Sequence, residues 1–411
     1  MEMRRTLLTI LALLPVLRAC TLPEVGEPYG DTLCTLTVVA QYPDGYADRA
    51  RAGVPVRLEE INLGAAYEAA TGADGSAVFR VPAGLYRVNV SDTDGEDIFN
   101  GAADKVRLGL TGAALSLKLL HSRAGTIVVK EIYCGGCKRL PQEGNYQYDQ
   151  YIILHNNDFR VQYLDGLCIG SLHPYNAMAT NPFVSKDPAS GESIFPAYVP
   201  VSEAVWQFGG DGTSFPLQPG EDAVVCLKGA IDHSAQFPLS VNLDRQGYFV
   251  CYNSTYFNNT AYHPAPGGNI ARDHYLEVVV KTGIANAYTF SINSPAVVLY
   301  RANGTTMREW AQTEGAVIPI PGGSTAQVAA VPLDWVVDAV EVFSGTSSAN
   351  AKRLAPSLDA GYVTLSDTFL GHTLFRRTDE ALSASAGYEV LKDTNNSSVD
   401  FYEREVQSLH E

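Results

Sequence analysis

Short stretches in which hydrophobic and polar residues alternate recur along the chain, separated by glycine, proline and asparagine. A period of two is typical of β-strands that bury one face. Residues 33–42 and 53–61 show this pattern, and the Asp-Gly pair at 74–75 predicts a tight turn. Phe79 and Val81 then share one face of the following strand. The first third of the chain is therefore predicted to be a small β-domain.

The same pattern continues beyond a plausible boundary at residues 121–126. Strands are predicted within these stretches: 126–133, 151–156, 161–169, 215–227, 291–304, 334–343 and 371–377. No long helical period interrupts them. We therefore predict an all-β protein of two β-sandwich domains, a small one over residues 33–120 and a larger one over residues 124–411.

Composition agrees with this fold class and narrows the choice of partners. The 411 residues include 36 glycines, 22 prolines and 22 tyrosines, as expected for many short strands joined by turns. The formal net charge of −16 argues against nucleic acid, since nothing would release phosphate counterions.

The N-terminus predicts export and lipid attachment. Arg4 and Arg5 precede an apolar run at residues 7–17, which is too short to span a bilayer but fits a signal sequence. It ends in Leu-Arg-Ala-Cys, which resembles a lipobox with Cys20 as the lipidated residue. We expect residues 1–19 to be a lipoprotein signal peptide and the polar residues 20–32 to be a tether. The alternative is an ordinary signal peptide followed by an incidental cysteine.

Residues 71–92 resemble the prealbumin-like regulatory domains found beside carboxypeptidases. The shared pattern is Thr, Asp-Gly, Phe, Pro-x-Gly and Tyr-x-Val. The resemblance implies a small sandwich of seven or eight strands that serves as a spacer or a binding aid.

The larger domain resembles the lamin-tail type of immunoglobulin-like sandwich. The phrases VVKEIY, YIILHN, VQYLDGLCI and LQPGEDAVV occur in the order of that family's strands. Two long insertions, near residues 171–215 and 230–290, would separate the halves.

Three phrases, NYQYDQYIILHNND, YLDGLCIG and LKDTNNSSVDF, are similar to those of a Bacteroidota lipoprotein family, domain of unknown function 4876. The resemblance implies a location in the outer membrane, where the lipid on Cys20 holds the protein. In Bacteroidota, acidic residues just after the lipidated cysteine help to send lipoproteins to the cell surface. Because acidic residues follow Cys20, we expect the protein to face the cell surface. The resemblance also implies a role accessory to TonB-dependent uptake receptors.

Cys134 and Cys137 are spaced as a redox pair or half of a zinc site would be. Gly135, Gly136 and Pro141 prevent the helix that a thioredoxin-like motif needs. No second Cys-x-x-Cys follows to complete a zinc site. A local disulfide is the preferred interpretation, while a free pair, a metal site and redox chemistry stay open. The cysteines at 168, 226 and 251 lie in apolar strands and are expected to be buried thiols.

Motifs for catalysis are missing from the sequence. There is no Gly-x-Ser-x-Gly, His-Glu-x-x-His, P-loop or Rossmann fingerprint, so we predict no enzyme and no cofactor. His173, His233, His263 and His274 are scattered; they are expected to be loop residues, with a transition-metal site as the alternative.

Aromatic residues in the loops are the best candidates for binding. Aromatic side chains beside amides suit stacking on sugars or anchoring a protein. The expected contact residues are Tyr146, Tyr148, Trp206, Tyr252, Tyr256 and Tyr262. We predict a non-enzymatic outer-membrane lipoprotein that binds a receptor. The alternatives are a glycan- or metal-binding lipoprotein and, third, a hydrolase without a recognisable motif.

Overall fold

The computed structural model describes residues 32–46, 49, 52–95, 97–189, 191–322, 325–345 and 349–410. The expected signal peptide, Cys20 and all of the expected tether except Thr32 lie outside these residues. The described chain is nearly all β-structure, which confirms the predicted all-β sandwich class. None of its helices is long and apolar enough to cross a membrane.

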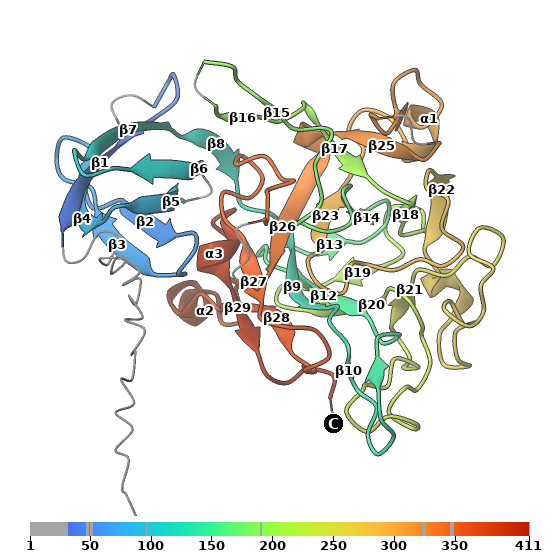
Figure 1. Cartoon of the computed structure of the whole chain (residues 1–411). Helices are drawn as coiled ribbons and strands as arrows, with labels where there is room; N and C mark the ends of the chain where they lie inside the picture. The colour runs from blue at the N-terminus through green and yellow to red at the C-terminus, as the bar shows by residue number, and fades with distance from the viewer. Residues whose placement is uncertain are drawn as a thin grey trace, which may run out of the picture.

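The N-terminal sandwich packs a sheet of three strands against a sheet of five (Figure 1). The first has the order β4 (Ser76–Pro82), β1 (Leu33–Gln41), β7 (Ala113–Lys118). The second has the order β3 (Ala66–Ala70), β2 (Pro55–Glu60), β5 (Gly84–Asp94), β6 (Asp97–Leu108), β8 (Leu120–Arg123). The strands predicted at residues 33–42 and 53–61 and after the 74–75 turn are β1, β2 and β4, and Phe79 and Val81 of β4 both face the core. The sequence pattern did not predict β3, β6, β7 and β8.

The larger sandwich has two sheets of six strands. One runs β21 (Phe249–Val250), β20 (Asp222–Cys226), β12 (Tyr151–Asn156), β9 (Ile127–Tyr133), β28 (Thr373–Arg376), β29 (Phe401–Arg404). The other runs β22 (Glu277–Lys281), β18 (Ala204–Gln207), β14 (Cys168–Ser171), β23 (Ala296–Tyr300), β26 (Val336–Ser344), β27 (Val363–Leu365). Apolar side chains from both sheets, such as Ile152, Leu154, Val297 and Leu299, form one core.

Smaller elements cover the ends of this sandwich. A three-stranded sheet has the order β17 (Tyr198–Val201), β25 (Gln327–Pro332), β24 (Val317–Pro319). The two-stranded pairs are β10 (Cys137–Lys138) with β11 (Asn145–Tyr146), β13 (Gln162–Tyr163) with β19 (Pro216–Leu217), and β15 (Ser185–Lys186) with β16 (Ser193–Ile194). The short helices are η1 (Arg272–His274), α1 (Met307–Trp310), η2 (Leu333–Trp335), α2 (Glu380–Ala386) and α3 (Ser397–Asp400).

The two segments expected to be insertions supply strands to the main sheets. β18 lies between β14 and β22, and β21 and β22 are edge strands. These segments are therefore part of the sandwich as well as sources of its loops.

The segment at residues 391–400 joins the two sandwiches. Asn100 of β6 donates to the carbonyl oxygens of Thr394 and Asn395 at 2.6 and 3.0 Å, and Asn395 donates back to Ser122 at 3.0 Å. The Asp393 carboxylate accepts from the amide of Gly125, between the last strand of one sandwich and the first of the other. The LKDTNNSSVDF phrase is thus an architectural joint.

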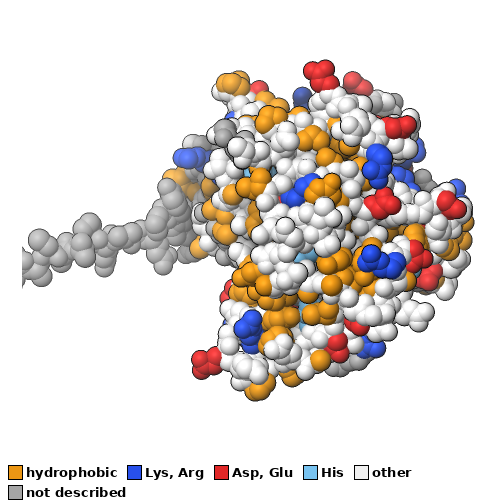
Figure 2. Space-filling model, turned by 90° about the vertical axis from the view of Figure 1, so that its right-hand side faces the viewer, with side chains coloured by type: hydrophobic (Ala, Val, Ile, Leu, Met, Phe, Trp, Pro, Cys, Tyr) orange, Lys and Arg blue, Asp and Glu red, His pale blue; other side chains and the backbone are white. Residues whose placement is uncertain are grey.

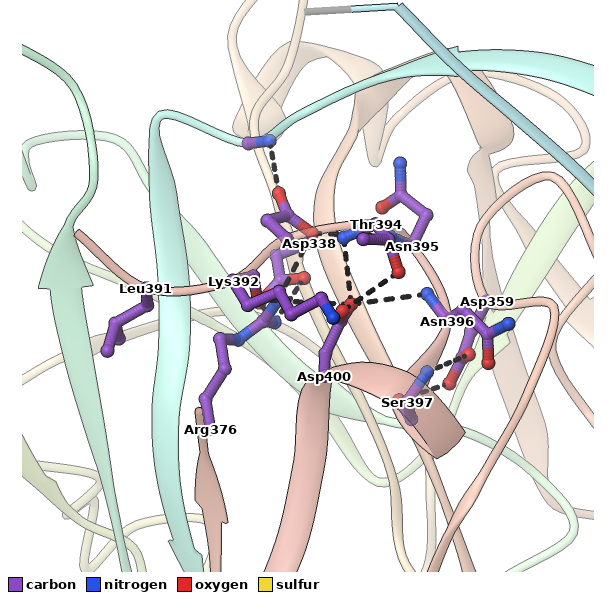
Figure 3. Close-up of polar contacts among 12 residues, drawn as sticks. Asp338, Asp359, Arg376, Leu391, Lys392, Thr394, Asn395, Asn396, Ser397 and Asp400 are labelled. Atoms are coloured by element: carbon purple, nitrogen blue, oxygen red, sulfur yellow. Dashed lines mark hydrogen bonds and ion pairs between the residues drawn. The ribbon is translucent and has the colours of Figure 1, made fainter. Parts of the chain in front are cut away.

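Beneath this joint lies a buried charge cluster around Arg376 (Figure 3). The guanidinium lies 2.7 Å from the Asp338 carboxylate, 3.1 Å from that of Asp393 and 3.8 Å from that of Asp400. All four side chains are at most 3% exposed. Burial raises the pKa of Asp338 and of Asp400, and the Asp393 charge adds to the rise while Arg376 opposes it. The cluster ties β26, β28 and the joint together.

Candidate functional site

A polar surface cleft of about 560 Å³ lies along the edge strand β22. Its lining comes from three segments: Tyr252, Asn253, Ser254 and Thr255; Arg272, Tyr275, Leu276, Glu277 and Val278; and Arg308. Figure 2 shows the face of the molecule that carries β22 and the loops of residues 250–290, where hydrophobic side chains and single basic groups are interspersed. A lining this polar favours a hydrated, hydroxyl-rich ligand over an apolar one.

A tight turn holds the first wall of the cleft. The Asn253 side-chain oxygen accepts from the amides of Thr255 and Tyr256 at 3.0 and 3.2 Å, as in an Asx-turn. Phe257 anchors the end of the turn in the core, where its ring stacks on Trp206 with centroids 5.5 Å apart. The turn therefore presents Tyr252 to Thr255 on a packed base.

Tyr252 and Tyr275 form an aromatic corner. Their rings lie 6.0 Å apart at 88°, and the other neighbour of Tyr252 is His263, stacked at 5.1 Å. The Arg272 guanidinium carbon lies 4.5 Å from the Tyr275 centroid, a cation–π contact. Within the described residues neither phenolic hydroxyl has a hydrogen-bond partner from the protein. Both hydroxyls are therefore available to a ligand.

Arg308, which belongs to α1, also lines the cleft. Thr306 and Glu309 cap this short helix reciprocally, and Met307 and Trp310 are buried, so Arg308 remains on the outside. Its guanidinium lies 3.3 Å from the Glu277 carboxylate. Both side chains are well exposed, so the pair contributes little to stability and a ligand can exchange with it.

Lys228 lies beneath the neighbouring tyrosines. Its ammonium nitrogen is 4.6 Å from the ring centroid of Tyr148, and Tyr148 packs edge-on against Tyr262 at 5.4 Å. Burial lowers the pKa of Lys228 to about 8, against some attraction from Asp149. Burial and the nearby Lys228 charge lower the pKa of His263 to about 4. These groups support the tyrosine loops from the inside.

The structure separates the six predicted contact residues. Tyr252 lines the cleft, Tyr256 and Tyr262 are 46% and 45% exposed, and Tyr148 is half-buried. The prediction is wrong for Trp206, which is 0% exposed because β18 is an inner strand. It is also wrong for Tyr146, which packs on Phe237 and bonds to His233 through its hydroxyl.

Sequence reasoning missed Arg272, Tyr275 and Arg308. Arg272 and Tyr275 flank η1, and Arg308 is 33 residues further along the chain than Tyr275. The Thr306–Glu309 capping signal marks α1, but nothing in the sequence places that helix against β22. Only the tertiary fold brings these residues to one cleft.

Cys134 and Cys137 are free thiols in the structure, so the predicted local disulfide is wrong. Both are buried, and β10 and β11 already close this loop as a small hairpin. Burial raises the pKa of each thiol to about 12, and the Asp149 charge adds to the rise for Cys137. A thiol with such a pKa is a poor nucleophile at neutral pH, which weighs against redox chemistry. Cys168, Cys226 and Cys251 are buried free thiols, as predicted, and Cys34 is a buried free thiol as well.

The histidines considered as metal ligands lie in separate environments. His233 bonds to Tyr146 and Gly229, His274 stacks on Phe249, and His263 stacks on Tyr252. The described residues contain no group of three or more His, Cys, Asp or Glu side chains placed to hold a metal ion.

Comparison with known proteins places this architecture. The family model described as "Protein of unknown function (DUF4876)" matches residues 218–408. A crystal structure of a DUF4876 family protein from Bacteroides thetaiotaomicron is similar over 91% of this chain and 95% of that chain, with 26% identity and a TM-score of 0.57. The chain is thus similar to DUF4876 proteins, in sequence over residues 218–408 and in structure over most of its length. Every residue that lines the cleft falls within the part of the chain that the family model matches.

Other solved structures resemble this chain only distantly. The major pilin SpaD from Corynebacterium diphtheriae matches 40% of this chain and 47% of its own, with 10% identity and a TM-score of 0.17. The minor pilin GBS52 from Streptococcus agalactiae matches 44% and 84%, with 12% identity and a TM-score of 0.14. The search of curated proteins found no match.

Proposed function

We propose that this protein is a non-enzymatic, lipid-anchored outer-membrane lipoprotein that binds a hydroxyl-rich ligand, such as a glycan, in the cleft beside β22. The observation that carries the proposal is the lining of the cleft. Tyrosine, asparagine, serine, threonine and arginine side chains converge there on packed supports. Aromatic side chains next to polar groups suit a ligand with both C–H faces and hydroxyls.

The carboxylates favour binding over hydrolysis. Glycoside hydrolysis ordinarily needs two carboxyl groups on either side of the scissile bond. Among the residues that line the cleft, Glu277 is the one carboxylate, and it is paired with Arg308. The proposed activity is therefore recognition without bond cleavage.

The proposed location and partner of the protein rest on features of the sequence. The lipobox-like residues around Cys20 support a lipid anchor, and the family resemblance supports the outer membrane and a nearby TonB-dependent receptor. In this proposal the protein captures the ligand and the receptor imports it.

Calorimetric titration of the purified protein with a panel of soluble glycans tests the binding function. We expect saturable binding that Tyr252→Ala weakens at least tenfold, since it removes one side of the aromatic corner. Tyr163→Ala, at an exposed tyrosine on β13 outside the lining, is the matched control and should bind as the original does. Equal binding by both variants would overturn the assignment to this cleft.

A further inference from the structure

We infer that the cleft selects saccharides that carry an oxyanion, a carboxylate or a sulfate, and that Arg272 is the residue that binds this group. The inference rests on the proposed binding function and narrows its ligand class. Three observations support the inference: the contacts of Arg272, the contacts of Arg308 and the net charge of the whole chain.

Arg272 has no carboxylate partner among the described residues. Its one side-chain contact there is the cation–π contact with Tyr275, and the residue is exposed at the cleft. The chain carries 45 acidic and 29 basic residues, so acceptors for a guanidinium are plentiful elsewhere on the surface. An arginine left without a carboxylate partner in such a protein, within a cleft, has donors that a ligand can take over from water.

The cation–π contact with Tyr275 also restricts the guanidinium, whose carbon lies 4.5 Å from the ring centroid. The guanidinium is planar and presents its N–H donors as a rigid fork. Carboxylate and sulfate oxygens match this fork and can accept two parallel hydrogen bonds. Arg272 is therefore pre-arranged to bind an anionic substituent while Tyr252 and Tyr275 contact the sugar.

Arg308 is expected to contribute less than Arg272 to binding the oxyanion. Its charge is shared with Glu277 at 3.3 Å, and the Glu277 carboxylate repels an anion on that side of the cleft. Lys228, the other basic group near these tyrosines, is only 5% exposed and is not part of the lining. The oxyanion is therefore expected on the Arg272 side.

Three polymers that share the same glucose backbone but differ in charge test this inference. They are neutral dextran, carboxymethyl-dextran and dextran sulfate. We expect the full-length lipid-free protein to bind one or both charged polymers at least tenfold more tightly than dextran in calorimetric titration. Comparison of the two charged polymers distinguishes carboxylate from sulfate. The preference should weaken as salt is raised, because the cleft is open to solvent.

The variants locate the preference. Arg272→Gln should reduce the affinity for the charged polymers about 10- to 100-fold, the range of a lost charge-assisted hydrogen-bond pair, and should reduce the affinity for dextran much less. Arg272→Lys keeps the positive charge but lacks the planar fork of donors. Its affinity for the charged polymers should lie between those of the original protein and Arg272→Gln. Arg160→Gln, at an exposed arginine outside the cleft, is the control for unspecific attraction. Thermal melting of each variant confirms that it is folded.

The outcomes distinguish this inference from the proposed function. Equal affinity for all three polymers, with Tyr252→Ala still weakening binding, overturns the inference and leaves the binding function standing. A preference that Arg272→Gln does not change, or that Arg160→Gln changes equally, also overturns it. Absence of binding to any glycan, charged or neutral, overturns both.

Discussion

Arg376 lies in the interior among three carboxylates, those of Asp338, Asp393 and Asp400. The one positive charge cannot neutralise three negative ones. Burial therefore disfavours full ionisation, and the raised pKa values of Asp338 and Asp400 express this. The backbone amides of Val129 and Gly125 satisfy part of the cluster, so it also fixes the start of β9.

Removal of the Arg376 charge should be severely destabilising. Arg376→Met leaves the carboxylates buried without a cation, and we expect a loss of roughly 3–5 kcal/mol in the free energy of unfolding. Urea denaturation followed by tryptophan fluorescence measures it. Arg160→Met, at an exposed arginine, should change stability by less than about 0.5 kcal/mol. Similar values for the two variants would contradict the role given to this cluster.

The same carboxylates predict how stability depends on pH. A raised pKa means that the folded protein keeps a proton that the unfolded chain has already released, so the unfolding free energy falls as pH rises through the raised pKa. The change is roughly 1.4 kcal/mol for each unit by which the pKa is raised. Asp400→Asn removes one such group and should make the protein less sensitive to a change from pH 5 to pH 8. Denaturation at both pH values tests this, and an unchanged difference would count against it.

Lys228 should titrate far below an ordinary lysine. In protein labelled with carbon-13 at lysine, one Cε signal should shift near pH 8 and should be missing from Lys228→Met. Because the folded pKa is depressed, the unfolded chain binds the proton first as pH falls, and stability decreases between the ordinary lysine range and pH 8. A Lys228 signal that moves only above pH 10 would refute the assigned burial.

Alternation of hydrophobic and polar residues found many of the main strands. β1, β2, β9, β12, β20, β23 and β28 lie within predicted stretches, and β26 extends one residue beyond its stretch. The alternation did not reveal that the segments expected to be insertions contain strands of the main sheets. β18 is four residues long and buried on both faces, so its sequence, Ala-Val-Trp-Gln, has no period that marks a sheet position. Its tryptophan therefore appeared to be a surface aromatic, although it supports the Phe257 turn from below.

The Cys-Gly-Gly-Cys stretch acts as a turn. Gly136 has a φ of +75°, and a Cβ atom on it would lie 2.1 Å from the carbonyl oxygen of Tyr146. Backbone bonds from Phe369 and Gly371 to the two glycine carbonyls dock the next loop on it.

Gly136→Ala should therefore destabilise the protein by roughly 2 kcal/mol or more, because strain and a backbone clash add. Gly304→Ala is the matched control, since Gly304 has a φ of +72° with no atom within 4 Å of its added Cβ. That variant should lose only about 1 kcal/mol. Equal melting temperatures for the two would exclude the clash.

At the scale of the whole molecule, the two sandwiches share a polar and aromatic interface. The rings of Phe343 and Tyr362 stack on each other with centroids 4.1 Å apart. The guanidinium carbon of Arg87 lies 5.2 and 5.1 Å from these centroids, and the guanidinium pairs with Asp104 at 3.0 Å. The hydroxyl of Tyr362 donates to Glu59 of β2. This interface couples the sandwiches, and we expect them to unfold together.

Arg87→Ala should separate the single calorimetric unfolding transition into two, because it removes the side chain that contacts both rings. Arg57→Ala, on the same strand pair but paired only with exposed Glu68, should keep one transition. A single transition in Arg87→Ala would show that the joint at residues 393–400 is sufficient for coupling.

Only part of the candidate site could be predicted from the sequence, because the tertiary fold of the whole molecule brings its segments together. The tyrosine-rich segment that contains Tyr252 is visible in the sequence, and it does line the cleft. The basic groups come from η1 and α1, which meet it only through the placement of β22 at the edge of a sheet. A cleft assembled across such distances has no local signature.

The six described cysteines have a practical consequence. Since every sulfur is shielded in the folded protein, an alkylating reagent can label a chain only after the part that holds the cysteine has opened. Cys34 is the one described cysteine of the N-terminal sandwich, and the other five belong to the larger one. Mass spectrometry of labelled peptides over time would thus record the opening of each sandwich separately, with no engineered probe.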